Sequence, residues 1–313
     1  MLLARLSQFR TLGMSALMAL ALVACKKEEL VVRPDNEAPD YDGVASVVVR
    51  NYVNRLFIDL LGREPVDAEM DAEVSALESA SLSMEARTAL VNKLMTSTAF
   101  VQGDSSYQHA YAQRTYEQFK ARFIEGVSDD VIDGFIGNAA QAALEDSLSG
   151  DAQGASESNS ALQRLLRLKS ARIHYREGAI TGLEMAKRMM FNDVYDEVNM
   201  NTFNFINASF DNLLFRFPTN AEFDAAYTMV EQSAPALLFG QSAQNKGGYL
   251  DILVNSAEGH EGLVRLFFRA YLGREPSTSE VFPILNAFMN DHDLRRMQRT
   301  ILVSDEYAGL QNS

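Results

Sequence analysis

The chain has 313 residues, of which 42 are acidic and 28 are lysine or arginine, so its formal net charge is −14. So acidic a chain repels the phosphates of nucleic acids and anionic lipid head groups, and we expect no nucleic-acid partner. It lacks tryptophan, has only seven prolines and is rich in alanine, leucine, methionine and glutamate. This composition favours an all-α fold of one large domain or two small ones.

The N-terminus has the pattern of a signal peptide. Arg5 and Arg10 precede an uncharged apolar segment over residues 12–24, which is shorter than the roughly 20 residues that cross a bilayer. The segment ends in Leu22-Val23-Ala24-Cys25, which resembles the lipobox of bacterial lipoproteins. The resemblance implies that Cys25, the only cysteine, carries acyl chains such as palmitate and becomes the mature N-terminus. The alternative is an ordinary secreted protein with an incidental cysteine.

A polar stretch follows Cys25. Lys26-Lys27-Glu28-Glu29 and the prolines at positions 34 and 39 predict a flexible tether over residues 25–45. Charge runs of this kind after a lipidated cysteine resemble export signals that carry some lipoproteins to the outer face of the outer membrane. We therefore expect a protein that is lipid-anchored to the cell outer membrane, and exposure at the cell surface stays open. The same composition would suit any solvated linker.

Three short motifs repeat along the chain. Leu61-Gly62-Arg63-Glu64-Pro65 and Leu272-Gly273-Arg274-Glu275-Pro276 are nearly identical, and Leu214-Phe215-Arg216-Phe217-Pro218 is a weaker copy. Each follows apolar residues at helical spacing. Glycine can end a helix in the left-handed conformation, and proline three residues later cannot continue it. Each motif therefore predicts a tight corner between two helices, and the chain is predicted to be a bundle of degenerate helix-corner-helix repeats.

The residues after each proline predict how the second helix begins. Ser277 with Glu280, and Thr219 with Glu222, have the spacing of a capping box. The first copy has Val66 at the cap position, so Asp67 is expected to cap that helix one residue later. In the middle copy Phe215 replaces glycine. Phenylalanine rarely takes a positive φ, so a different backbone is expected there.

An arginine is common to all three corners, at Arg63, Arg216 and Arg274. It could bind a carboxylate or phosphate of a ligand. It could instead bond unpaired carbonyls of the preceding helix or pair with the glutamate of the capping box. Because a repeated corner needs the same bonds each time, we favour a structural role. The structural corner residues would then be Gly62, Arg63, Pro65, Arg216, Pro218, Gly273, Arg274 and Pro276.

The corner, together with the closing Ser304-Asp305-Glu306-Tyr307, resembles an uncharacterised helical module of secreted and surface-attached bacterial proteins, which sometimes lies beside calcium-binding repeats. A similar Leu-Leu-Gly-Arg-x-Pro stretch opens another uncharacterised family, found with secreted cytochromes. Residues 263–309 are the best match. The resemblance implies a helical fold and a cell-envelope setting, and it assigns no catalytic residue.

The region between the first two copies contains three further features. Tyr107, Tyr111, Tyr116, Phe119 and Phe123 form an aromatic row that could bind sugars or peptides, although packing between helices is the commoner role. A helix is expected over 129–148, followed by an exposed, mobile loop over 149–158. An asparagine-rich stretch at 199–204 could bond a polar ligand or form a connection.

The helix after the loop carries the densest positive charge of the chain. Its residues could dock an acidic partner, or they could pair with the chain's own carboxylates, which we favour. These candidate partner-binding residues are Arg164, Arg167, Arg172 and Arg176, with Lys169 between them.

Patterns typical of catalytic sites are incomplete. His260-Glu261 begins a zinc-protease motif, but Val264 stands where the second histidine should be. We expect no catalytic residue, metal site or cofactor. The leading hypothesis is a non-catalytic, lipid-anchored envelope protein that binds a protein partner or builds an assembly. One alternative is a surface lipoprotein that captures a glycan or peptide in a cleft with Tyr111, Tyr116 and Asn204. Another is a hydrolase with a dispersed acidic site.

These patterns divide the chain into five parts: a signal peptide (1–24), a tether (25–45), a first repeat copy (46–103), an intervening helical region (104–203), and the second and third copies (204–313).

Overall fold

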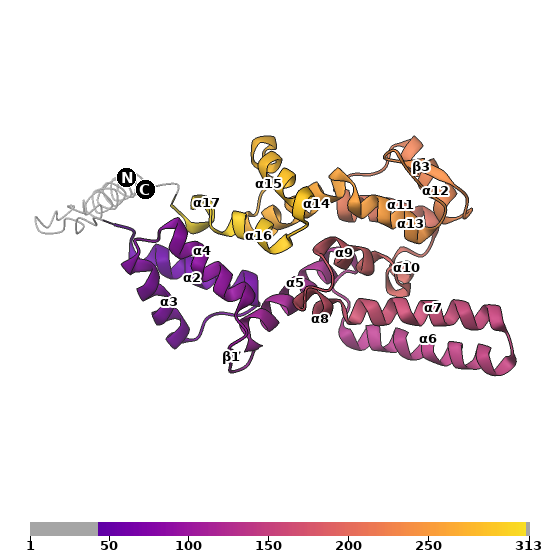
Figure 1. Cartoon of the computed structure of the whole chain (residues 1–313), viewed down its shortest axis with the longest axis horizontal. Coiled ribbons are helices and arrows are strands. Elements are labelled where there is room, and N and C mark those ends of the chain that lie inside the picture. Colours follow the sequence, from indigo (N-terminus) through magenta and orange to yellow (C-terminus); the bar gives the residue numbers. More distant parts are fainter. Residues whose placement is uncertain (1–42, 311–313) are drawn as a thin grey trace, which may run out of the picture. The chain divides into compact units, whose positions relative to one another are not determined.

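The computed structural model describes residues 43–310, and the fold is all-α (Figure 1). The predicted signal peptide, Cys25 and the predicted tether up to residue 42 lie outside the described residues. The described residues belong to a single compact unit. The three repeat copies and the region between them therefore belong to one unit. Within the described part, no helix is both long and apolar enough to cross a membrane.

The described residues form 16 helices and two short antiparallel hairpins. The helices are α2 (Ser46–Leu61), α3 (Asp67–Ser79), α4 (Met84–Thr96), α5 (Tyr107–Phe123), α6 (Asp129–Ser149), α7 (Ala152–Lys169), α8 (Ala171–Arg176), α9 (Gly182–Met190), α10 (Asp193–Asn199), α11 (Thr202–Leu214), α12 (Asn220–Val230), α13 (Lys246–Asn255), α14 (Ala257–Leu272), α15 (Thr278–Asp291), α16 (Leu294–Leu302) and α17 (Asp305–Ala308). The strands are β1 (Phe100–Val101) with β2 (Ser105–Ser106), and β3 (Ala236–Leu238) with β4 (Gln241–Ala243).

Each repeated motif joins two helices that pack against each other. The pairs are α2 with α3, α11 with α12, and α14 with α15. Gly62 (φ 76°, ψ 14°) and Gly273 (φ 67°, ψ 17°) are left-handed helix ends, which confirms the predicted corners. The different backbone expected at Phe215 was wrong, because this residue is also left-handed (φ 57°, ψ 30°). The helix-corner-helix geometry is therefore common to all three copies.

In each corner a glutamate three residues after the cap position (Glu69, Glu222 or Glu280) bonds the start of the second helix. Its carboxylate accepts the backbone N–H of Thr219 at 2.7 Å, of Ser277 at 2.7 Å and of Val66 at 2.9 Å. The expected cap at Asp67 was wrong, since Asp67 is already the first residue of α3. The glutamate closes the helix end even where the cap residue has an apolar side chain, so a hydroxyl at that position is dispensable.

The aromatic row of α5 lies in the hydrophobic core, and its five side chains are all buried. A polar network crosses the same core. The Tyr111 hydroxyl donates to Gln298 Oε1 at 2.5 Å, and Gln298 Nε2 donates to the Tyr271 hydroxyl at 2.8 Å. Tyr175 lies 2.9 Å from the Tyr111 hydroxyl and donates to it. Since a buried polar group without a partner is costly, this network restricts how α5, α14 and α16 can pack.

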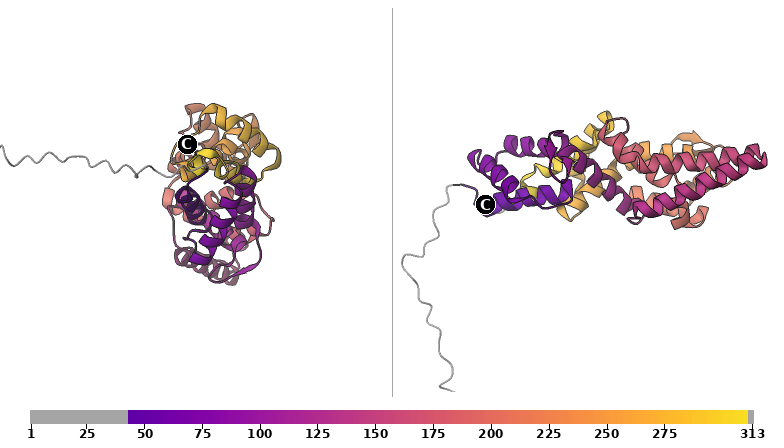
Figure 2. Two further views of the ribbon diagram at one scale, coloured as in Figure 1. Left: turned by 90° about the vertical axis from the view of Figure 1, so that its left-hand side faces the viewer. Right: turned by 90° about the horizontal axis from the view of Figure 1, so that it is seen from below.

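The region of residues 104–203 differs from expectation in two places. The predicted mobile loop over 149–158 was wrong, because only Gly150 and Asp151 separate α6 from α7. Gly150 ends α6 in the left-handed conformation, and the Asp151 side chain caps α7. Figures 1 and 2 show α6 and α7 side by side, and packing between them overrides the weak helix propensity of the serines and glycine. The predicted basic helix is two helices, α7 and α8, that separate at Ser170.

Candidate functional site

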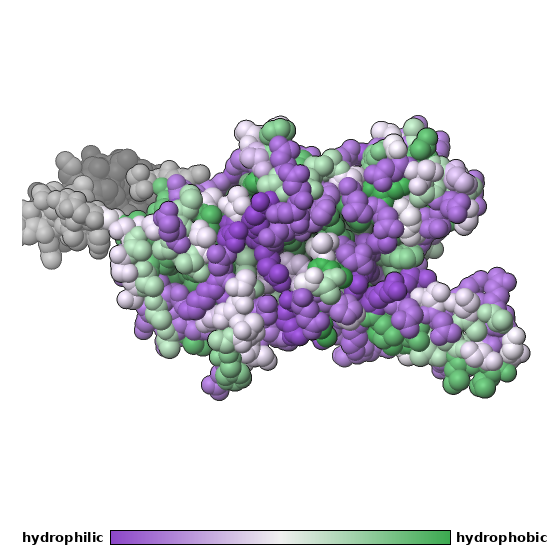
Figure 3. Space-filling view, viewed as in Figure 1, coloured by the Kyte–Doolittle hydropathy of each residue, from purple (hydrophilic) through white to green (hydrophobic). Residues whose placement is uncertain are grey.

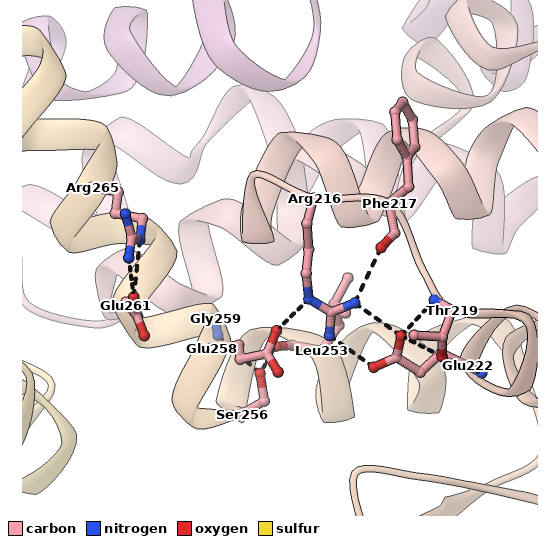
Figure 4. Close-up of polar contacts among 10 residues, drawn as sticks. All are labelled: Arg216, Phe217, Thr219, Glu222, Leu253, Ser256, Glu258, Gly259, Glu261 and Arg265. Carbon is pink, nitrogen blue, oxygen red and sulfur yellow. Dashed lines mark hydrogen bonds and ion pairs between the residues drawn. The ribbon is translucent and has the colours of Figure 1, made fainter. Parts of the chain in front are cut away.

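The corner arginines make an identical set of bonds in all three copies. Figure 4 shows the middle one: Arg216 Nη2 and Nη1 donate to the two carboxylate oxygens of Glu222 at 2.7 and 2.9 Å. Arg216 Nε donates to Glu258 at 2.8 Å, and Nη1 also donates to the backbone oxygen of Phe217 at 3.1 Å. We call this set of bonds the arginine clamp.

The other two clamps have the capping glutamate and the backbone oxygen at equivalent positions, and each takes its second acid from a third segment. Arg63 bonds Glu69, Asp104 and the backbone oxygen of Glu64; Arg274 bonds Glu280, Glu306 and the backbone oxygen of Glu275. Each guanidinium also lies over a phenylalanine ring six residues earlier in the chain, at 5.3–5.6 Å from the ring centroid: Phe57, Phe210 and Phe268. The clamp thus ties the end of one helix, the start of the next and a third segment together.

The clamps keep their carboxylates ionised. Hydrogen bonds from Arg216 lower the pKa of Glu222 to about 2, and those from Arg274 do the same for Glu280. Burial disfavours the charged form of Glu69, yet bonds from Arg63 and Val66 lower its pKa to about 2 as well. Most donors of each arginine are used within the protein. The arrangement supports pairing with the capping glutamate, whereas the carbonyl that each arginine reaches precedes the proline and does not belong to the preceding helix.

Sequence reasoning missed the second acid of each clamp, although a signal was present for two of the three. Glu258 and Glu306 both stand two residues after a serine that caps the next helix, at Ser256 and Ser304. Adjacent carboxylates such as Glu280 and Glu306 resemble the paired acids of a hydrolase. Bonds from Arg274 lower the pKa of both. A general acid at neutral pH requires a raised pKa, so this pair fits a structural role better than general acid catalysis.

The middle corner departs from the other two at Phe215 and Phe217. The ring of Phe215 lies between the guanidinium groups of Arg122 and Arg269, each 4.3 Å from its centroid. These cation–π contacts, worth roughly 0.5–2 kcal/mol each, offset the strain of a positive φ and explain why a phenylalanine is tolerated. The Phe217 ring points away from the clamp in Figure 4 and is 68% exposed.

A cavity of about 590 Å³ lies beside this corner. Two of the predicted asparagines, Asn199 and Asn204, contribute to it. Tyr111 and Tyr116 are buried in the core, so the structure does not bring them together with Asn204. The cavity is lined by Arg122, Phe123, Glu125, Val198, Asn199, Phe203, Asn204, Asn207, Ala208, Asp211, Asn212 and Phe217.

Most of the candidate partner-binding arginines have partners within the protein. Arg164 pairs with Asp193 at 3.1 Å, and Arg172 bonds Asp129 at 3.2 Å. Arg176 Nη1 donates to His109 Nδ1 at 2.9 Å. Lys169 pairs with Asp133, while Arg167 is exposed. Internal pairing, the interpretation favoured from the sequence, is present for Arg164, Lys169 and Arg172.

His260 is buried and bonded on both ring nitrogens. Its Nδ1 donates to the Ser256 backbone oxygen at 2.8 Å, so its Nε2 accepts from His292 Nδ1 at 2.9 Å. Burial lowers the pKa of His260, which favours the neutral ring that this arrangement needs. Across residues 43–310 no group of three metal-ligating side chains converges. The pair serves to join α14 to the end of α15.

Comparison of the chain with family models, with curated proteins and with solved structures gives no match, so function is inferred from its own residues.

Proposed function

We propose that the protein is a non-catalytic, lipid-anchored component of the bacterial cell envelope, and that its helical body binds a protein partner or forms part of an assembly. One observation carries the proposal: the sole cysteine, Cys25, ends an apolar leader in a lipobox-like sequence. The helical body begins at Ser46, which leaves about 20 residues as a tether. Several acyl chains at ~0.8 kcal/mol per buried CH₂ would anchor the chain stably in a bilayer.

The structure of the helical body is suited to a scaffold role. Three arginine clamps tie successive helix ends together, so the positions of the helices depend on many linked contacts. The α6–α7 hairpin packs mostly upon itself, and Leu144 and Leu148 on α6 are 59% and 79% exposed. Figure 3 shows apolar surface at the far end of this hairpin. Exposed apolar patches on soluble surfaces often mark protein interaction sites, so we assign the partner contact to this hairpin.

Membrane fractionation tests the anchor. Wild-type protein should sediment with the outer membrane, whereas Cys25→Ala should be released or remain as an uncleaved precursor at the inner membrane. A Cys25→Ala variant that still fractionates with the outer membrane would count strongly against the proposal.

Cross-linking in intact cells tests the partner. A photoreactive residue at position 148 should cross-link to another envelope protein, while one at the exposed position of Glu78 on α3 should not. Equal cross-linking from both positions, or none from position 148, would reject the hairpin as the contact surface.

A further inference from the structure

The middle corner carries an aromatic side chain that its arginine clamp does not use. In the first and third corners the residue before proline is Glu64 or Glu275, and in each corner the arginine clamp holds only its backbone oxygen. Phe217 keeps that backbone bond, but its ring is 68% exposed. Exposing a large apolar ring brings no gain in stability. The presence of phenylalanine at position 217, where the other two corners have glutamate, therefore indicates a role outside the corner itself.

Phe217 lines the 590 Å³ cavity together with a second exposed phenylalanine. Phe203, at the start of α11, is 61% exposed. Its ring lies 5.1 Å from that of Phe223, which in turn stacks on Tyr227 at 6.1 Å. Two aromatic rings that solvent can reach, Phe203 and Phe217, thus border the cavity, whereas Phe223 and Tyr227 are not among its lining residues. Exposed rings stack on ligands whose own surfaces are flat and apolar, including the C–H faces of sugar rings.

Asparagine amides supply the polar part of the cavity. The Nδ2 groups of Asn199, Asn207 and Asn212 donate to Tyr195 O at 2.7 Å, Phe203 O at 2.9 Å and Tyr195 Oη at 3.1 Å. These bonds fix three amides. Their Oδ1 atoms have no hydrogen-bond donor within residues 43–310, and the Asn204 side chain makes no hydrogen bond there. Three fixed acceptors and one free amide, which can both donate and accept, can bond hydroxyl groups.

The charge of the cavity argues against an anionic ligand. Arg122 Nε donates to the backbone oxygen of Asn212 at 2.8 Å, and its guanidinium also contacts the Asp211 backbone oxygen and carboxylate. Its charge is thereby offset within the protein. Glu125 is the third charged lining residue besides Arg122 and Asp211, so the lining carries no excess positive charge. A phosphate or sulfate would find no unpaired cation among the lining residues. A peptide that binds by adding a strand needs a sheet edge, and neither described hairpin contributes to the lining.

We propose that this cavity binds a neutral oligosaccharide, with Phe203 and Phe217 stacking on sugar rings and the asparagine amides bonding hydroxyl groups. The volume is in the range of pockets that hold compact organic ligands. Binding at this site does not depend on acylation of Cys25, so it can be tested apart from the proposed anchor. Such binding would attach the proposed envelope scaffold directly to a polysaccharide.

The test is binding of the purified full-length protein to an array of neutral and charged oligosaccharides and short peptides, followed by titration calorimetry with the neutral glycan that binds best. Phe217→Glu installs the residue type of the other two corners and keeps the clamp bond. We expect it and Phe203→Ala to weaken binding at least tenfold, and Asn204→Ala to weaken it several-fold. Phe282→Ala is the matched control, because Phe282 is 65% exposed on α15 outside the cavity.

The outcomes separate cleanly. Binding of a neutral glycan that Phe217→Glu and Phe203→Ala weaken at least tenfold, with Phe282→Ala unchanged and all melting temperatures equal, supports the site. If Phe217→Glu lowers the melting temperature, Asn204→Ala decides, since its side chain has no hydrogen bond to lose within the described residues. Binding only of charged glycans, binding only of peptides, no binding at all, or equal weakening by Phe282→Ala would each overturn it.

Discussion

Replacing Glu222 with glutamine tests the arginine clamp directly, because the change keeps the shape of the side chain and removes its charge. The pKa of Glu222 is about 2, against an ordinary value of 4.5. At 1.36 kcal/mol for each pKa unit this difference sets an upper limit of about 3 kcal/mol. The side chains of Glu222 and Arg216 are 19% and 34% exposed, so solvent screening should reduce the loss to about 1–2 kcal/mol.

The sign of the pH dependence follows from the direction of the shift. Since the folded pKa is lower than the unfolded one, the stabilisation is complete above pH 4.5 and is lost as the pH falls toward 2. Urea denaturation should therefore find Glu222→Gln less stable than wild type at pH 7, and the gap should shrink by more than half at pH 3. Glu64→Gln serves as the control and should change little, because the Arg63 clamp bonds only the backbone oxygen of Glu64 and not its side chain. A gap that is the same at both pH values would refute this reasoning.

Three further substitutions test other contacts by chemical denaturation. Gly262→Ala would place a Cβ atom 1.7 Å from the Leu213 backbone oxygen, where α11 crosses α14, and should cost about 1–3 kcal/mol or prevent folding; wild-type stability would contradict this contact. Phe215→Ala retains the strained φ without the stacked guanidinium groups and should cost about 1–2 kcal/mol, more than Phe215→Gly. Gln298→Leu leaves the buried Tyr271 hydroxyl without its donor and should cost about 1–3 kcal/mol; a neutral effect would mean that the network is dispensable.

Local chemistry made the two glycine corners predictable. The left-handed conformation of Gly62 and Gly273 depends only on the freedom of glycine to adopt a positive φ. The capping glutamates that follow bond the start of the helix to which they belong, so both features depend on residues close in sequence. Phe215 was mispredicted because its conformation depends on Arg122, 93 positions earlier in the chain, and on Arg269. A prediction from neighbouring residues alone cannot include contacts with side chains so distant in the sequence. The same reason applies to residues 152–158, which are helical because α6 lies against them.

The candidate cavity was only partly foreseeable. The asparagine-rich stretch at 199–204 drew attention to polar side chains, and two of them do line the cavity. The aromatic residues beside them were sought on α5, which contributes only the buried Phe123, whereas the exposed aromatic lining residues are Phe203 and Phe217. A departure from the repeat pattern was the available signal for Phe217, since the other two copies have glutamate there. Comparing repeats within one chain can thus separate residues that the corner needs from those that it does not.

Acylation of Cys25 is the claim on which the envelope setting depends, and mass spectrometry of the mature N-terminal peptide tests it most directly. The proposal predicts that residues 1–24 are absent and that Cys25 is the first residue, with the added mass of several acyl chains. An unmodified Cys25 in a protein cleaved at another position would contradict the lipid anchor.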